Sequence, residues 1–184
     1  MKAFTFLVFL VFLVFLCLSL AAAGQIRSVT VQVGGLTCAM CSRAVQKSME
    51  KVAFIKQVQP NFKTQEYTIT FREGQSISLD EIKKSIEGAG FSVARFQLSA
   101  QFDNTIIRAG QPLALGAQHF YILNMADETL NGVRTLVIVE KGFLTAKGLK
   151  NYCGDEKLKC LEPARGAASG SYHAVMEPAK QPAS

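Results

Sequence analysis

The chain has 184 residues, a formal net charge of +6, no tryptophan and five cysteines. This length fits one large or two small domains. Its basic residues are scattered, without a Lys/Arg run or a series of aromatic residues for base stacking, so we expect no nucleic-acid partner. Glycine-rich phosphate loops, nucleophile elbows and helical histidine metal motifs do not occur in the sequence, so we expect no enzyme and no catalytic residue.

The first 23 residues are typical of a signal peptide. Met1-Lys2 gives a positive start, the stretch from Phe4 to Leu20 is almost wholly apolar, and three alanines follow it. Cleavage is therefore expected before Gly24. The alternative is an uncleaved membrane anchor, because the apolar run approaches the length that spans a bilayer. With cleavage, we expect a periplasmic or secreted protein without membrane insertion.

Residues 26–98 predict a compact α+β domain. Val29, Val31 and Val33 alternate with polar residues, which is typical of a half-buried strand. The apolar spacing of Val45 and Met49 then predicts a helix. The rest of the predicted order is a strand over 54–59, a strand over 67–71, a helix that Ser78 caps and Gly88-Ala89-Gly90 ends, and a strand from Phe91. This βαββαβ order is that of a ferredoxin-like fold.

Two cysteines lie three positions apart where the first strand gives way to the first helix. If Cys38 lies in the loop and Cys41 in the first helical turn, both sulfurs can face one small cation. The unpaired N–H groups and positive dipole end of the helix favour the thiolate form of Cys41. Two thiolates on an apolar loop suit Cu(I) and related soft metals, whereas a full zinc site needs four ligands.

The segment Gly35-Leu36-Thr37-Cys38-Ala39-Met40-Cys41, the later Ala89-Gly90-Phe91 and the element order resemble the heavy-metal-associated domain family. This family includes copper chaperones, copper-pumping ATPases and exported mercury-binding proteins. The resemblance implies that Cys38 and Cys41 are metal ligands, that Phe91 lies on a loop beside them, and that Leu36 takes the place of a usual Met whose side chain enters the core. It covers about forty per cent of the chain.

Residues 102–176 predict a second, β-rich domain, for which a partly open barrel is one arrangement. We expect strands over 118–125, 134–139 and 171–176, a turn over 127–132, a short helix over 145–152 and a flexible tail over 177–184. Cys153 and Cys160 lie in this part of the chain. Export permits a disulfide between them, and a second metal site or a resolving thiol pair is the alternative.

Other soft donors are less favoured as ligands. Met40 lies between the two cysteines, but we expect its side chain to face solvent. The remaining donors are His119, His173, Met125 and Met176, for which core or surface roles are expected. On a strand, the spacing of three between His173 and Met176 would put them on opposite faces.

These patterns favour an exported soft-metal protein. It would hold Cu(I), or else Hg(II) or Zn(II), at Cys38 and Cys41 and exchange the ion with another thiolate protein or a metal transporter. A thiol–disulfide exchange protein that uses the same two cysteines is the main alternative. A metal-dependent sensor or adaptor is the third. The sequence does not indicate which oligomeric state the protein adopts.

Overall fold

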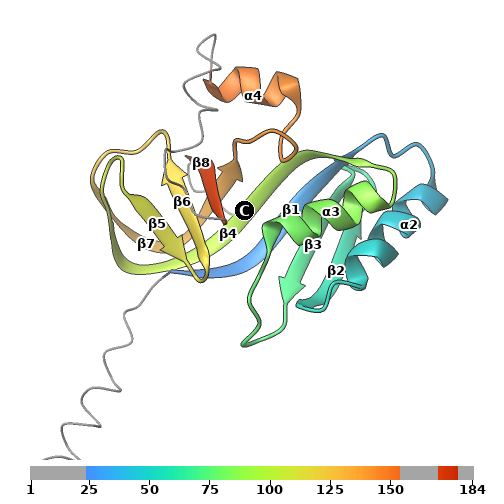
Figure 1. Cartoon of the computed structure of the whole chain (residues 1–184), viewed down its shortest axis with the longest axis horizontal. Helices are drawn as coiled ribbons and strands as arrows, with labels where there is room; N and C mark the ends of the chain where they lie inside the picture. Colours follow the sequence, from blue (N-terminus) through green and yellow to red (C-terminus); the bar gives the residue numbers. More distant parts are fainter. Residues whose placement is uncertain (1–23, 154–169, 178–184) are drawn as a thin grey trace, which may run out of the picture.

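The computed structural model describes residues 24–153 and 170–177. The expected signal peptide, Cys160 and the tail beyond Glu177 lie outside the described residues. Within them, two regions share one continuous β-sheet (Figure 1).

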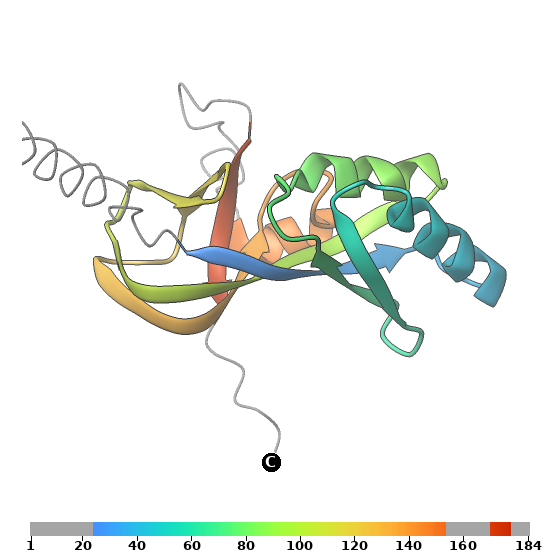
Figure 2. The same cartoon turned by 90° about the horizontal axis from the view of Figure 1, so that it is seen from below.

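The first region is the ferredoxin-like unit that the sequence predicts. Its four strands lie in the order β2-β3-β1-β4, and all neighbours are antiparallel. Helices α2 and α3 cover one face of these strands (Figure 2). The elements, with the labels of Figure 1, are β1 (Gln25–Gly34), α2 (Ala39–Glu50), β2 (Ile55–Asn61), β3 (Glu66–Phe71), α3 (Leu79–Gly88) and β4 (Ser92–Ile107). The α+β class and the βαββαβ order are confirmed.

The expected β-rich region follows and extends the same sheet in the order β4-β7-β8-β6-β5. The last strand, β8, lies between β7, to which it is antiparallel, and β6, to which it is parallel. The sheet curls in this region but does not close (Figure 1). The elements are β5 (Pro112–Leu115), β6 (Gln118–Ile122), β7 (Glu128–Ile138), α4 (Ala146–Cys153) and β8 (Ser171–Glu177).

Strand β4 joins the two regions. It has 16 residues, pairs with β1 from Ser92 to Gln101, and pairs with β7 from Gln97 to Ile107. A β-bulge interrupts its pairing with β7 between Phe102 and Thr105. The sequence placed a boundary between two domains at residues 98–102, which lie inside this strand. The division into two domains therefore stays a prediction, whereas the shared strand is a structural fact.

The core follows from the alternation of side chains along the strands. Val29, Val31 and Val33 are fully buried in β1, as predicted, and Val45 and Met49 of α2 pack over them. One cluster of buried side chains continues from these residues into the second region. Its members there include Phe102, Leu115, Phe120, Leu130 and Leu136.

Two details of the second region differ from the prediction. The expected turn over 127–132 is mostly strand, because β7 begins at Glu128 and pairs with the distal part of β4. Strand β5 was not predicted, since four residues that begin with a proline give almost no periodic signal.

The predicted capping of α3 by Ser78 is confirmed: its Oγ accepts a hydrogen bond from the Glu81 N–H at 3.3 Å.

Candidate metal site at the start of helix α2

The loop between β1 and α2 turns sharply at Gly35 and is anchored at Leu36. Gly35 has a φ of +85°, a conformation that favours glycine. The next side chain, Leu36, is only 7% exposed and belongs to the core. The expectation that Leu36 fills the place of a buried methionine is confirmed as far as its burial is concerned.

Cys38 caps helix α2. Its backbone is extended (φ −145°, ψ 155°), and its Sγ accepts a hydrogen bond from the Cys41 N–H at 3.1 Å. Cys41 lies in the first helical turn, as predicted. This turn contains no acidic residue, so no carboxylate in it opposes the N–H groups and positive dipole end of the helix.

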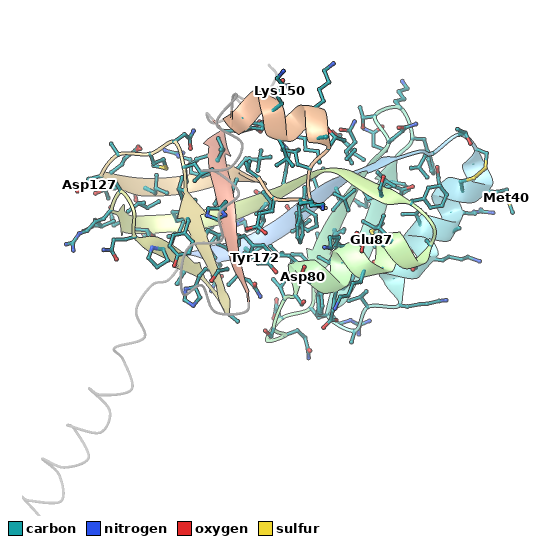
Figure 3. All side chains as sticks on the ribbon, turned by 45° about the horizontal axis from the view of Figure 1, so that its top comes forward. Met40, Asp80, Glu87, Asp127, Lys150 and Tyr172 are labelled. Carbon is teal, nitrogen blue, oxygen red and sulfur yellow. A yellow bond between two sulfur atoms is a disulfide. The ribbon has the colours of Figure 1, made fainter. Side chains whose placement is uncertain are left out.

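The sulfur atoms of Cys38 and Cys41 are joined in a disulfide, with the two Cα atoms 5.3 Å apart (Figure 3). The structure thus shows the oxidised pair. In this state neither sulfur is a thiolate, and a metal can bind only after reduction. The assignment of both cysteines as metal ligands therefore stays a prediction.

The pair lies at the tip of the molecule, beside the labelled Met40 (Figure 3). Cys38 is exposed and Cys41 is half-buried. Met40 is 75% exposed, which agrees with the expectation that it faces solvent. Within residues 24–153 and 170–177, no group of three or more His, Cys, Asp and Glu side chains is arranged to hold a metal ion.

Neighbouring elements contact this loop and the first turns of α2. Phe91, in the loop just before β4, lies beside Gly35, since a Cβ atom built at Gly35 would be 3.9 Å from the Phe91 ring. This is the position expected for Phe91. The Tyr67 hydroxyl donates a hydrogen bond to the Ser42 carbonyl at 3.1 Å, and burial raises the pKa of Tyr67, so the phenol stays a neutral donor.

One contact to this loop is not predictable from the sequence. The side-chain amide of Gln65, in the turn between β2 and β3, donates a hydrogen bond to the Leu36 carbonyl at 2.8 Å. The two residues are 29 positions apart, and no local pattern in the sequence links them.

The other candidate donors do not converge with the cysteines. His173 lies on β8, where its backbone N–H and its ring contact Glu140, and Met176 of the same strand is buried. His119 lies exposed on β6. Met125 packs at the edge of the core. The places of these four side chains agree with the core and surface roles that the sequence predicts.

The second cysteine pair is only partly covered by the structure. Cys153 is the last residue of α4, and Cys160 lies outside the described residues. Their expected disulfide stays a prediction.

The fold and the site define a class: a ferredoxin-like α+β unit with a Cys-x-x-Cys pair at its first loop–helix junction. The model of the family described as "Heavy-metal-associated domain" matches residues 30–92. The chain is 34% identical over 65 residues to the mercuric transport protein periplasmic component of Serratia marcescens, a match that covers 35% of this chain and 70% of that protein. The chain belongs to the heavy-metal-associated domain family.

Two further matches cover similar shares of the chain. A copper-transporting ATPase of Helicobacter pylori is 35% identical over 60 residues, which are 33% of this chain and 8% of the ATPase. The crystal structure of oxidized MerP from Ralstonia metallidurans CH34 is 33% identical over 39% of this chain and 97% of that chain, with a TM-score of 0.33. These similarities leave the second region outside the comparison.

None of the helices within 24–153 and 170–177 has the length and apolar character needed to cross a bilayer.

Proposed function

We propose that the reduced form of this protein binds one soft metal ion through Cys38 and Cys41 and passes it on by thiolate exchange. Cu(I) is the first choice, and Hg(II) and Zn(II) are the alternatives. The observation that carries this proposal is the Cys-x-x-Cys pair at the exposed start of α2, in a chain of the heavy-metal-associated family. The role is that of a carrier or scavenger and involves no catalysis.

The donor set suits a metal with few ligands. Two sulfur ligands with Cα atoms 5.3 Å apart can hold an ion that accepts two-coordinate binding, whereas Zn(II) favours four ligands. The described residues offer no cluster of three donors, and Met40 faces solvent. The names of two relatives, a mercuric transport component and a copper-transporting ATPase, favour the same soft metals.

Transfer follows from the exposure of the site. Because Cys38 lies at the tip of the molecule, a thiolate of another metal-binding protein or of a metal transporter can approach the bound ion. One incoming thiolate binds the metal and displaces Cys38 or Cys41, and a second thiolate of the acceptor then displaces the other cysteine. The ion changes proteins without entering solution as a free ion.

In an oxidising compartment the cysteine pair must be reduced before it can bind a metal ion. An apolar leader and the periplasmic relative support a periplasmic location, where disulfides form readily. The disulfide must therefore accept two electrons and two protons from a thiol reductant before the metal binds, and the reductant becomes oxidised. Metal binding then releases the thiol protons.

A competition titration tests the proposal. The reduced protein is titrated with Cu(I) against a chromophoric chelator, and the same titration is run with Hg(II) and Zn(II). We expect the native protein to take one equivalent of Cu(I) from the chelator. The Cys38→Ser, Cys41→Ser variant should take none.

The second cysteine pair provides the matched control for that titration. A Cys153→Ser, Cys160→Ser variant removes two thiols but leaves the site at α2 intact, so its copper uptake should equal that of the native protein. Uptake that depends on Cys153 and Cys160, or that survives the loss of Cys38 and Cys41, would contradict the proposal.

The disulfide itself favours a second candidate function, thiol–disulfide exchange. A disulfide at a helix N-terminus, with one sulfur exposed, is open to attack by another thiolate. In that case the reduced protein should reduce insulin disulfides at a rate that depends on Cys38, and it should compete poorly for Cu(I).

A further inference from the structure

Gln65 occupies an unusual place for a glutamine. It is the last residue of the turn that joins β2 to β3, and its backbone is left-handed, with a φ of 55°. Its carbonyl accepts a hydrogen bond from the Val33 N–H at 3.0 Å, and its side-chain amide donates to the Leu36 carbonyl at 2.8 Å. The main chain of Gln65 thus contacts Val33 and its side chain contacts Leu36, at the two ends of the segment 33–36 that leads to Cys38.

The backbone conformation of Gln65 is costly for this residue type. A left-handed backbone is unfavourable for residues other than glycine and asparagine, and glycine would avoid that cost. Among the described residues, Gln65 and Asn104 are the non-glycine residues with positive φ. Asparagine is commonly found in this conformation, whereas glutamine is not. The turn alone therefore gives no reason for glutamine at position 65.

The turn does not need the Gln65 side chain to stay on the sheet. The side-chain amide of Gln32, on β1, donates to the Thr64 carbonyl at 3.2 Å, and the main-chain bond between Gln65 and Val33 adds a second tie. The side-chain bond of Gln65 acts instead on Leu36, two residues before Cys38. Leu36 is then held twice, by its buried side chain and by its carbonyl.

We propose that Gln65 is a positioning residue for the cysteine pair. Through the Leu36 carbonyl it keeps the loop in the form in which the Cys38 sulfur faces Cys41. The inference rests on the proposed function where metal is concerned, because the same arrangement would hold two thiolates ready for one ion. Preorganised ligands bind more tightly since less freedom is lost on binding.

The same restraint acts on the redox equilibrium of the pair. In the reaction with glutathione, the disulfide and two glutathione thiols give the dithiol and oxidised glutathione. A loop held by Gln65 keeps the two thiols close and favours the disulfide. Without this bond the dithiol form gains conformational freedom, and the equilibrium shifts toward the dithiol.

The test compares two substitutions at position 65 with one matched control. Gln65→Gly relieves the backbone strain and removes the side-chain bond, and Gln65→Asn tolerates the left-handed backbone but is too short for the same reach. Asn104→Gly places glycine at the other left-handed non-glycine position, which lies at the β4 bulge in the second region. All variants are purified after expression of the full sequence.

Three quantities are measured on each protein. The first is the thermal unfolding midpoint. The second is the oxidised fraction of the cysteine pair in glutathione buffers, read by differential alkylation and mass spectrometry of the tryptic peptide over residues 28–43, which excludes Cys153 and Cys160. The third is the affinity of the reduced protein for Cu(I), measured against a chelator.

We expect the Gln65→Gly protein to unfold at the native temperature or above it. Its glutathione equilibrium should shift about 2- to 10-fold toward the dithiol and its Cu(I) affinity should fall by a similar factor, as for the loss of one hydrogen bond. Gln65→Asn should shift the glutathione equilibrium and the Cu(I) affinity in the same directions as Gln65→Gly. Asn104→Gly should leave the glutathione equilibrium and the Cu(I) affinity within 1.5-fold of the native values.

Two results would overturn the positioning role. One is a glutathione equilibrium of both position-65 variants within 1.5-fold of native, and the other is an equal shift in Asn104→Gly. A native protein that takes up no Cu(I), with the glutathione shift still present in the Gln65 variants, would overturn the proposed function and support the positioning role. The two inferences therefore fail separately.

Discussion

The hydroxyl of Tyr172 donates a hydrogen bond to the carboxylate of Asp80 at 2.9 Å, across 92 positions of the sequence. Tyr172 lies on β8, the last strand, and Asp80 lies in the first turn of α3 (Figure 3). A second bond joins the same two regions: the Gln118 side-chain amide donates to the Ile77 carbonyl at 2.8 Å. The second region is thus fastened to the ferredoxin-like unit by α3 as well as by β4.

Replacing Tyr172 by Phe should lower the free energy of unfolding by about 1 kcal/mol. The ring stays in the core, but one hydrogen bond to a carboxylate is lost, and Asp80 is exposed enough for water to replace it. Chemical denaturation followed by circular dichroism measures the change. Tyr121→Phe, which alters a less buried tyrosine of β6, is the control and should change the free energy by less than about 0.5 kcal/mol.

Stability should fall at alkaline pH. Burial, and next the bond to Asp80, raise the pKa of Tyr172 above its ordinary value. Tyrosines of the unfolded chain ionise near pH 10, while folded Tyr172 keeps its proton. Above that pH the unfolded state binds fewer protons, so the unfolding free energy should drop by about 1.4 kcal/mol per pH unit for this residue. Below pH 10 its contribution is fully present.

The Tyr172→Phe variant shows how much of the fall in unfolding free energy at alkaline pH comes from Tyr172. Burial also raises the pKa of Tyr67 and Tyr152, so part of the slope should persist in the variant. Denaturation curves at intervals between pH 9 and 11 should show a shallower slope for Tyr172→Phe than for the native protein. Equal slopes would contradict the assignment.

The end of β8 holds helix α4 in place through a half-buried polar cluster. Glu177 forms an ion pair with Arg95 and accepts hydrogen bonds from Gln97 at 2.9 Å and from Tyr152 at 3.1 Å. The Arg95 Nε atom is buried without a hydrogen-bond partner, so the guanidinium depends on Glu177 and Tyr152 for its contacts. Tyr152 belongs to α4.

Replacing Glu177 by Ala should therefore loosen α4. Both members of the ion pair are about 30% exposed, which limits the expected loss of unfolding free energy to about 1–2 kcal/mol. Hydrogen exchange followed by mass spectrometry should show faster exchange over residues 146–152. Glu87→Ala, an exposed position on α3, is the control and should leave this exchange unchanged. Unchanged protection of α4 in Glu177→Ala would rule out the anchoring role.

Gly24 lies where the start of β1 meets the second region. A Cβ atom at this position would lie 2.7 Å from the Leu115 Cδ2 atom and 2.9 Å from the Phe102 ring, and both side chains are buried. Gly24→Ala should cost about 1–3 kcal/mol through overpacking. Gly88→Ala meets no atom within 4 Å and should be neutral or stabilising by up to about 1 kcal/mol. Thermal unfolding of both variants tests the contrast.

The ferredoxin-like unit was predictable because its patterns are local. Alternation at Val29, Val31 and Val33 marks β1, and Ser78 with Glu81 marks the start of α3. The second region was less predictable because its pairing is not local. Strand β4 runs through the expected boundary at residues 98–102 without a turn residue, and β8 enters the sheet between strands that precede it by more than thirty positions.

At the candidate site too, local features were predictable from the sequence and non-local contacts were not. The places of Cys38 in the loop and of Cys41 in the first helical turn follow from the change of period around them. The bond from Gln65 to Leu36 depends on how β2 and β3 turn back beside β1, which no spacing along the chain reveals. The oxidation state of the cysteines depends on the surrounding redox poise as well as on sequence.

Met40 should not be a metal ligand, although its thioether is a soft donor between the two cysteines. Its side chain is 75% exposed, whereas a third ligand would have to fold back over the sulfurs. Met40→Leu removes the sulfur and keeps the size and the helix propensity. The Cu(I) affinity of the reduced variant should stay within 2-fold of native in a chelator competition. A loss of 10-fold or more, with the unfolding midpoint unchanged, would identify Met40 as a third ligand and give the site trigonal coordination.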